Sequence, residues 1–218
     1  MSKPRPPKTQ ERGRETRERI LTCAVDLLAR HGFDAMTMRQ LGEAAGLDNS
    51  SLYRHFPSKA ALVHATLDRV TGHVLSAIGS RIDPTEPASL QALEDVCATA
   101  GLHLFDHPAA ARLIVHWIMS MGDANAGFKL SVPAGDQSRP GGRMLALLRD
   151  WLDRGARRGV LRKHATPESI VLLMGAVLIR PATYGYFLTS LEPKRTRAAA
   201  RTAWEKELRA AVRGAFAP

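Results

Sequence analysis

The chain of 218 residues is 44% hydrophobic, which is enough to build a core and argues against a disordered protein. Its formal net charge of +10 and pI of about 10.3 suit a polyanionic partner such as nucleic acid, but the Arg-rich composition of a GC-rich genome produces the same excess. Charge alone therefore leaves nucleic-acid binding open.

Several classes of protein are excluded by features that the sequence lacks. The two cysteines, Cys23 and Cys97, fall on apolar helical faces and form no CxxC pair, so neither a disulfide framework nor a cysteine metal site is expected. The N-terminus is polar, and the longest apolar run, residues 170–179, is far shorter than the roughly 18 residues of a membrane span. Alternating strand patterns are rare. The sequence predicts a soluble, cytoplasmic, all-α protein.

The first fifteen residues carry three prolines among basic residues and offer no apolar face, which predicts a disordered basic arm over residues 1–15. From about Thr16 to His31, apolar residues recur at i, i+4, i+7 and i+8, which predicts a helix with one buried stripe. Gly32 is suited to the left-handed position that ends such a helix.

The second helix has clear start and stop signals. Thr37 and Gln40 have the spacing of a capping box, which predicts a helix over Met38 to about Ala45, and Gly46 ends it. Asp48 then serves as the N-cap of a third helix. Two helices separated by a short Gly-containing turn are a helix-turn-helix motif.

The third helix, residues 49–55, is only seven residues long and would not be stable alone in water. At 100° per residue, Leu52 and Phe56 share a face that can dock on the preceding helices, while Ser50 and Arg54 point the opposite way. Such residues are ordinarily just solvated. The shortness of the helix and its exposed aromatic and basic side chains instead favour insertion into a DNA major groove.

Residues 16–63, "TRERILTCAVDLLARHGFDAMTMRQLGEAAGLDNSSLYRHFPSKAALV", resemble the DNA-binding region of the tetracycline-repressor (TetR) family of bacterial transcription factors. The resemblance implies a homodimer of all-helical subunits. Each subunit would have a three-helix DNA-binding domain over residues 16–58, a connecting helix over 59–83, and a ligand-binding and dimerisation domain over 84–218.

Carried over position by position, the resemblance implies a set of DNA contacts on the second, third and fourth helices. Contacts to phosphates or flanking bases are expected from Thr37 and Arg39, contacts to the DNA backbone from Ser51, Tyr53, His55 and Lys59, and contacts to base edges from Gln40, Ser50 and Arg54. Asn49 departs from the Lys-Gly that the family often has here, so one phosphate contact is lost. Its amide could bind adenine, although its angle lies near the docked face. The basic arm either enters a minor groove or remains a solvated tail.

Further helices are expected over residues 87–105, 108–121, 142–158, from 166, and over 196–216, with a loop over 122–142 as a possible lid. The family keeps its ligand pocket among the middle helices, where the candidates are His103, His116, Trp117, Met121 and Tyr184. Each is more often an ordinary core residue. His103 and His107 have metal-ligand spacing, but no third ligand lies nearby, so no metal is expected.

The run at residues 170–179 is apolar on every side, and a second apolar stripe follows on the last helix. Packing within one subunit is the alternative to what the resemblance implies, which is a four-helix bundle between two subunits. That bundle would use Val171, Met174, Gly175, Leu178, Trp204, Leu208 and Val212.

These observations predict a transcriptional regulator, a repressor that a largely apolar small-molecule effector releases from a pseudo-palindromic DNA operator. The protein would associate with the nucleoid, and no cofactor or membrane partner is expected. One alternative is an architectural DNA binder without sequence preference, for which the charge and the arm argue. The other is an enzyme in the helical body, against which stands the absence of GxSxG, HExxH, GxGxxG and phosphate-loop motifs.

Overall fold

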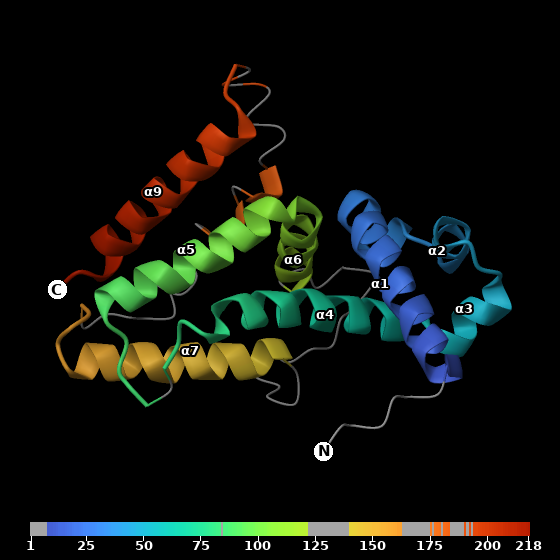
Figure 1. The fold of residues 1–218 in the computed structure, drawn as a ribbon, viewed down its shortest axis with the longest axis horizontal. Coiled ribbons are helices and arrows are strands. Elements are labelled where there is room, and N and C mark those ends of the chain that lie inside the picture. Colours follow the sequence, from blue (N-terminus) through green and yellow to red (C-terminus); the bar gives the residue numbers. More distant parts are fainter. Residues whose placement is uncertain are drawn as a thin grey trace.

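The computed structural model of the chain describes residues 8–83, 85–121, 140–162, 175, 177–179, 181–183, 190, 192 and 194–218. Every regular element within these residues is a helix, which confirms the all-α prediction. The helices are α1 (Lys8–Ala35), α2 (Met38–Ala45), α3 (Asn49–His55), α4 (Lys59–Gly79), α5 (Leu90–Asp106), α6 (Pro108–Met121), α7 (Pro140–Arg157) and α9 (Arg197–Phe216). We call α1–α3 the head and α5, α6, α7 and α9 the body; α4 runs between them (Figure 1).

The first helix begins at Lys8, earlier than the predicted start near Thr16, so residues 8–15 of the expected disordered arm are helical. The apolar stripe begins only at Ile20, but the preceding residues are mostly Glu, Gln and Arg, which favour helix without any packing. Glu11 in the first turn also complements the helix dipole. At the other end, Gly32 adopts φ 75°, so the regular helix breaks where the sequence predicted.

The start of α5 also differs from the prediction, because the helix begins at Leu90 and not at Pro87. Ser89 is the N-cap, and its side chain accepts a hydrogen bond from the amide of Ala92. The amide of Ala88 donates to the carbonyl of Trp151 on α7 at 3.3 Å, which holds this segment against α7 and out of the helix. The bounds of α6 are as predicted, and α9 starts one residue after the predicted Thr196, which is its N-cap.

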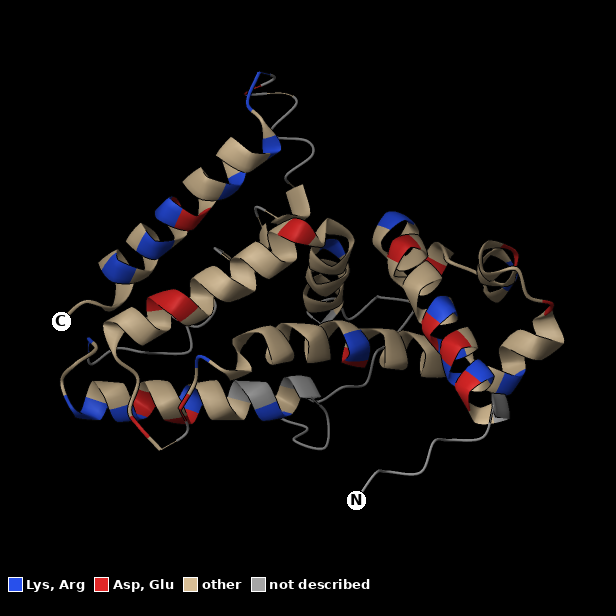
Figure 2. Ribbon diagram, in the orientation of Figure 1, with Lys and Arg blue, Asp and Glu red and all other residues tan. Residues whose placement is uncertain are grey.

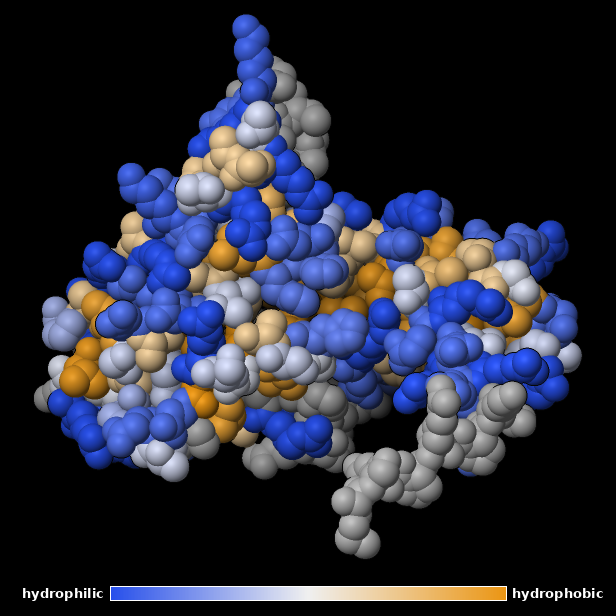
Figure 3. Space-filling model, in the orientation of Figure 1, coloured by the Kyte–Doolittle hydropathy of each residue, from blue (hydrophilic) through white to orange (hydrophobic). Residues whose placement is uncertain are grey.

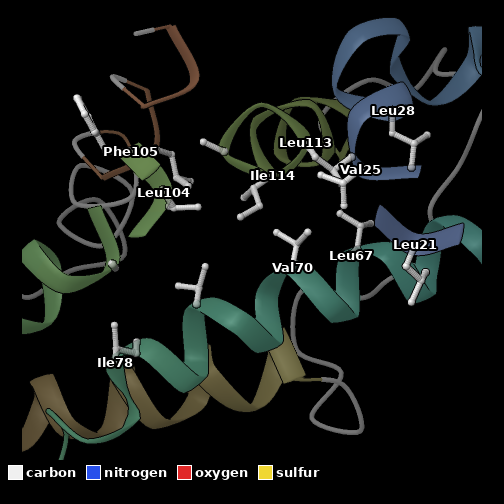
Figure 4. Packing of buried hydrophobic residues seen from close by; sticks show 14 of the residues in the cluster. Leu21, Val25, Leu28, Leu67, Val70, Ile78, Leu104, Phe105, Leu113 and Ile114 are labelled. Carbon is white, nitrogen blue, oxygen red and sulfur yellow. The ribbon is translucent and has the colours of Figure 1, made fainter. Parts of the chain in front are cut away.

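The head docks on the body through a continuous apolar core. Leu21, Val25 and Leu28 of α1 lie opposite residues of two other helices, Leu67 and Val70 of α4 and Leu113 and Ile114 of α6 (Figure 4). Hydrophobic residues show between head and body on an otherwise largely hydrophilic face (Figure 3). Polar contacts add to the α1–α4 packing. Arg69 donates to Glu18 at 2.9 Å and to Thr22 Oγ1 at 3.1 Å, and Lys59 Nζ donates to the carbonyl of Asp34 at 2.9 Å.

The last helix packs its apolar stripe against α5 of the same chain. Trp204, Leu208 and Val212 are 7%, 1% and 0% exposed. At Gly101 of α5, an added Cβ would lie 2.6 Å from Leu208 Cδ2, which shows how closely the two helices approach. Within one chain, α5 therefore covers Trp204, Leu208 and Val212, as in the alternative of packing within one subunit. Their place in an interface between two subunits stays a prediction.

Arginines on α9 reinforce this packing with ion pairs to α5. Figure 2 shows basic residues along α9 and acidic residues near both ends of α5. Arg213 forms a bidentate pair with Glu94 (2.9 and 2.8 Å), and Arg209 pairs with Asp95 at 2.7 Å. The Arg213 hydrogen bonds lower the pKa of the buried Glu94 carboxyl against the opposing effect of burial. This contribution to stability is therefore present at neutral pH and is lost in acid.

Other residues of the predicted subunit interface are only partly described. Val171 and Met174 lie outside the described residues. Gly175 is helical and half-buried, and Leu178 is 7% exposed, so Leu178 is also covered by its own chain. The predicted helix start at Thr166 and most of the predicted loop over 122–142 lie outside the described residues as well. Among the described residues, no helix is long and apolar enough to cross a membrane.

Gly155 on α7 provides a test of the contact between α7 and the segment before α5. A Cβ there would lie 2.5 Å from the carbonyl oxygen of Ala88, which is backbone and cannot rotate away. Gly155→Ala should destabilise the protein by about 1–3 kcal/mol, because the overpacking outweighs the gain in helix propensity. Urea denaturation measures this, with Gly72→Ala on α4 as the control because nothing lies within 4 Å of its added Cβ. Equal stability of the two variants would contradict the close contact.

Candidate DNA-binding surface

The start of α2 is built by the predicted capping box. Thr37 Oγ1 accepts from the amide of Gln40 at 3.2 Å, and Gln40 Oε1 accepts from the amide of Thr37 at 2.9 Å and from Thr37 Oγ1 at 3.0 Å. The side-chain oxygen of Gln40 is thus already used by the cap, which leaves only its NH₂ group for a base edge. Arg39 is highly exposed and pairs with Glu43 at 3.0 Å on the surface.

The turn between α2 and α3 depends on two glycines. Gly46 takes φ 64°, the left-handed conformation that ends α2. Gly42 lies inside α2, and a Cβ there would be 2.9 Å from the carbonyl oxygen of Leu47. The absence of a side chain at Gly42 therefore lets the turn fold back on α2, and the Leu47 amide donates to the Gly42 carbonyl at 2.8 Å.

The third helix has the two faces that the sequence predicted. Leu52 and Phe56 are 0% and 1% exposed and belong to the core. Ser50 and Arg54 are exposed, and Tyr53 keeps 48% of its surface in solvent. Ser51 and His55 are half-buried on the flanks. Asn49 is exposed, yet its Oδ1 is 3.7 Å from the Cβ position of Gly42, so it lies toward α2.

The cap of α3 organises the side chains on its exposed face. Asp48 accepts hydrogen bonds from the Ser51 amide at 2.7 Å, from Ser50 Oγ at 2.7 Å and from Ser51 Oγ at 3.0 Å. Arg54 Nη2 in turn donates to Ser51 Oγ at 2.7 Å. The hydrogen bonds from the two serines lower the pKa of Asp48 from 3.8 to about 2. Asp48 is therefore an acceptor at neutral pH, and the Ser50 hydroxyl proton points toward it.

The lowered pKa of Asp48 predicts a pH dependence of stability. A carboxyl whose folded pKa is about 2 and whose unfolded value is 3.8 stabilises the folded state above pH 3.8, and this contribution is lost as the pH falls toward 2. Asp48→Asn keeps a capping side chain but does not titrate. The variant should melt at a lower temperature than the wild type at pH 7, and the difference should narrow between about pH 4 and pH 2.

Circular dichroism melts across this pH range measure the effect. Asp26→Asn is the matched control, because Asp26 is an exposed acid on α1 and no side-chain contact of its carboxylate is seen among the described residues. A difference between wild type and Asp48→Asn that stays constant from pH 7 to pH 2 would contradict the assigned hydrogen bonds.

Only some of the residues predicted to contact a ligand are described by the structure. His116 and Trp117 are half-buried on α6, and within the described part of the chain neither His116 Nδ1 nor Trp117 Nε1 has a hydrogen-bond partner. His103 is half-buried on α5, where burial, His107 and His73 lower its pKa. The side chain of Met121 and all of Tyr184 lie outside the described residues.

The spacing of His103 and His107 leads to contact between the two rings but not to a metal site among the described residues. Their centroids are 4.5 Å apart, and His107 Nδ1 lies 2.8 Å from the carbonyl oxygen of His103. In the part of the chain that the structure describes, no group of three His, Cys, Asp or Glu side chains could hold a metal ion. Cys97 is buried, which raises the pKa of its thiol to about 12, and Cys23 is half-buried.

Sequence reasoning missed two residues that shape the head. Gly42 carries a recognisable signal, since a glycine inside a short helix is unfavourable and indicates a close approach by another segment. Arg17 of α1 carries no such signal: it contacts His55 and Phe56, which are far away in the sequence. An exposed arginine on a solvent-facing side of a helix has no pattern that distinguishes it from its neighbours.

Comparison with known proteins identifies this head. Residues 20–66 match the family described as "Bacterial regulatory proteins, tetR family". The nucleoid occlusion factor SlmA of Haemophilus influenzae is 28% identical over 95 residues, and the transcriptional repressor KstR of Mycolicibacterium smegmatis is 39% identical over 59 residues. The chain covers only 43% and 29% of the lengths of these two relatives.

The fold, by contrast, is shared over nearly the whole chain. A TetR family transcription regulator from Marinobacter aquaeolei superposes with a TM-score of 0.69, covering 95% of this chain and 98% of that one, at 19% sequence identity. The sequence match in the head and the fold of the entire chain agree with the resemblance seen in residues 16–63. Residues 20–66 thus match the tetR family of bacterial regulatory proteins, and the chain as a whole shares the fold of the solved regulator.

Proposed function

We infer that the protein is a sequence-specific DNA-binding transcriptional regulator, a repressor that a small-molecule effector releases from its operator. The observation that carries this inference is the arrangement of α3. Its apolar side is buried through Leu52 and Phe56, while Ser50, Tyr53 and Arg54 face solvent. No acidic residue follows the Asp48 cap on α3, so the exposed side can approach phosphates without repulsion.

Each predicted DNA contact has a role in this proposal. Arg54 offers guanidinium donors to a guanine edge, and Ser50, whose proton points to Asp48, offers an acceptor oxygen. Tyr53, His55, Ser51 and Lys59 would contact the DNA backbone, with Thr37, Arg39 and Gln40 at the start of α2 and Asn49 beside the turn. These side chains come from the helix-turn-helix, at the start of α2 and on α3, and from the start of α4.

The proposal includes a homodimer that binds two half-sites of a pseudo-palindrome, at the nucleoid in the cytoplasm. The predicted interface on the last two helices remains part of this proposal, although Trp204, Leu208 and Val212 pack on α5 within one chain. Sedimentation equilibrium of the full chain tests the dimer. The effector would be a mostly apolar molecule, held among the middle helices, where His116 and Trp117 offer buried N–H groups or an acceptor nitrogen. No catalytic activity is assigned.

A second candidate is DNA binding in the service of chromosome organisation, without promoter control. Two observations favour it: the net charge of +10 and the similarity to proteins named nucleoid occlusion factors. An architectural binder without sequence preference would be displaced equally by any DNA, because phosphate contacts carry no sequence information.

One experiment separates these candidates. The full chain is used to select bound fragments from random double-stranded DNA, and the selected sequence is then competed against random DNA of equal length. A palindromic consensus that resists competition supports the regulator, and its genomic copies beside promoters would name the genes. If the selection recovered only random sequences, the proposal of sequence-specific binding would be wrong.

A further inference from the structure

Arg17, an arginine of the first helix, contacts the end of α3. Arg17 Nη1 of α1 donates a hydrogen bond to the carbonyl of His55, the last residue of α3, at 3.1 Å. The guanidinium carbon of the same side chain lies 4.2 Å from the centroid of the Phe56 ring. Arg17 is thus bound to two consecutive residues at the point where α3 stops.

The carbonyl of His55 needs a donor that α3 cannot provide. The last four carbonyls of a helix have no partner within the helix. Here the chain beyond Phe56 continues with Pro57, which has no N–H, and the amide of Phe56 donates to Leu52 at 3.0 Å. A cation at the C-terminus of a helix also interacts favourably with the helix dipole. Arg17 therefore supplies both a donor and a charge of the favourable sign.

The planar guanidinium of Arg17 also covers the ring of Phe56. Phe56 is 1% exposed, although it follows the exposed helix directly and begins the extended turn to α4. Arg17 itself is exposed, so its guanidinium lies as a cover over the ring. A planar cation stacks well on an aromatic face, which the compact ammonium of lysine does less well.

The opposite end of α3 is held by other means. There, Asp48 caps the helix, and Gly42 lets the turn pack on α2. Without Arg17, the anchors of the C-terminal half of α3 among the described residues would be the apolar contacts of Leu52 and Phe56. Apolar contacts are not directional, so they fix the orientation of the helix less well than a hydrogen bond does. Arg54, the predicted base reader, belongs to this half.

We propose that Arg17 is a positioning residue, which clamps the C-terminal end of α3 so that Arg54 meets its base pair in one orientation. This proposal rests on the function inferred above. It assigns to Arg17 an effect on the preference for one sequence, acting through α3. An arginine that instead touched a phosphate would change binding to all sequences alike and would change its salt dependence.

The test compares three variants of the full chain. Arg17→Met removes both contacts, Arg17→Lys keeps the charge but not the planar group, and Arg19→Met removes a neighbouring exposed charge of α1 as the matched control. For each we measure the dissociation constant for the selected DNA site and for random DNA at several salt concentrations. Amide hydrogen exchange of α3, at a temperature where all variants are folded, provides a readout that needs no DNA.

We expect Arg17→Met to weaken binding to the selected site about tenfold while random DNA is bound nearly as before, with the salt slope unchanged. Arg17→Lys should lose most of the same preference. The amides of Arg54, His55 and Phe56 should exchange about tenfold faster in Arg17→Met and at the wild-type rate in Arg19→Met.

Two results would overturn the proposal. One is equal behaviour of Arg17→Met and Arg19→Met, which would make Arg17 one positive charge among several. The other is unchanged exchange of the α3 amides in Arg17→Met. If the wild type itself shows no sequence preference, the inferred function fails, but the exchange measurement still decides whether the clamp exists.

Discussion

Leu52→Ala should cost about 2–5 kcal/mol of folding free energy and abolish specific DNA binding. Leu52 is fully buried and is the residue through which the middle of α3 reaches the core. A helix of seven residues has too little intrinsic stability to persist once this contact becomes a cavity. The expected result is a protein whose body remains folded while α3 loses its fixed position.

The matched control for this prediction is Leu93→Ala on α5, which removes an equally buried leucine from the body. Both variants should lower the midpoint of urea denaturation by similar amounts, but only Leu52→Ala should lose affinity for the selected DNA site under conditions where both remain folded. Equal loss of DNA binding in the two variants would show that general destabilisation, and not the position of α3, is responsible.

Arg54→Ala should relax the preference for one base pair by about 1–3 kcal/mol while the protein stays folded. Arg54 is exposed on α3, and its hydrogen bond to Ser51 uses only part of its guanidinium. The measurement is the set of dissociation constants for the selected site and its single-base variants, in wild type and Arg54→Ala.

Tyr53→Ala is the companion variant for this experiment. Tyr53 lies next to Arg54 in sequence with 48% of its surface exposed, and it is expected to contact the DNA backbone. Its loss should weaken binding to all the sites by a similar factor, without a change in preference. If Arg54→Ala also weakened every site equally, or if both variants bound the selected site like the wild type, α3 would not be the element that reads the sequence.

The head could be predicted in detail because its signals are local. Thr37 with Gln40, Gly46, and Asp48 mark helix ends through contacts within a few residues, and all of these caps are present in the structure. The start of α1 was less predictable, since the interpretation required an apolar face, whereas residues 8–15 are helical through their intrinsic preference. The expected arm was therefore too long.

The partners of apolar stripes could not be predicted from the sequence. The stripe of Trp204, Leu208 and Val212 was correctly placed on one side of the last helix, but its period is the same whether it meets α5 or a second subunit. The pair of Arg213 with Glu94 joins residues 119 positions apart in the sequence. Arg17 and His55 are a further case, because residues 38 positions apart are in contact and nothing in their spacing indicates it.

The shared core of α1, α4 and α6 has a consequence for dissecting this protein. A fragment that ended at Gly79 would keep every predicted DNA contact but would bare the sides of Val25, Leu28, Leu67 and Val70 that Leu113 and Ile114 now help to cover. The isolated head would therefore expose an apolar patch, and we expect such a fragment to aggregate. Because α6 packs against α1, we also expect substitutions on α6 to change the position of the head and so its DNA binding.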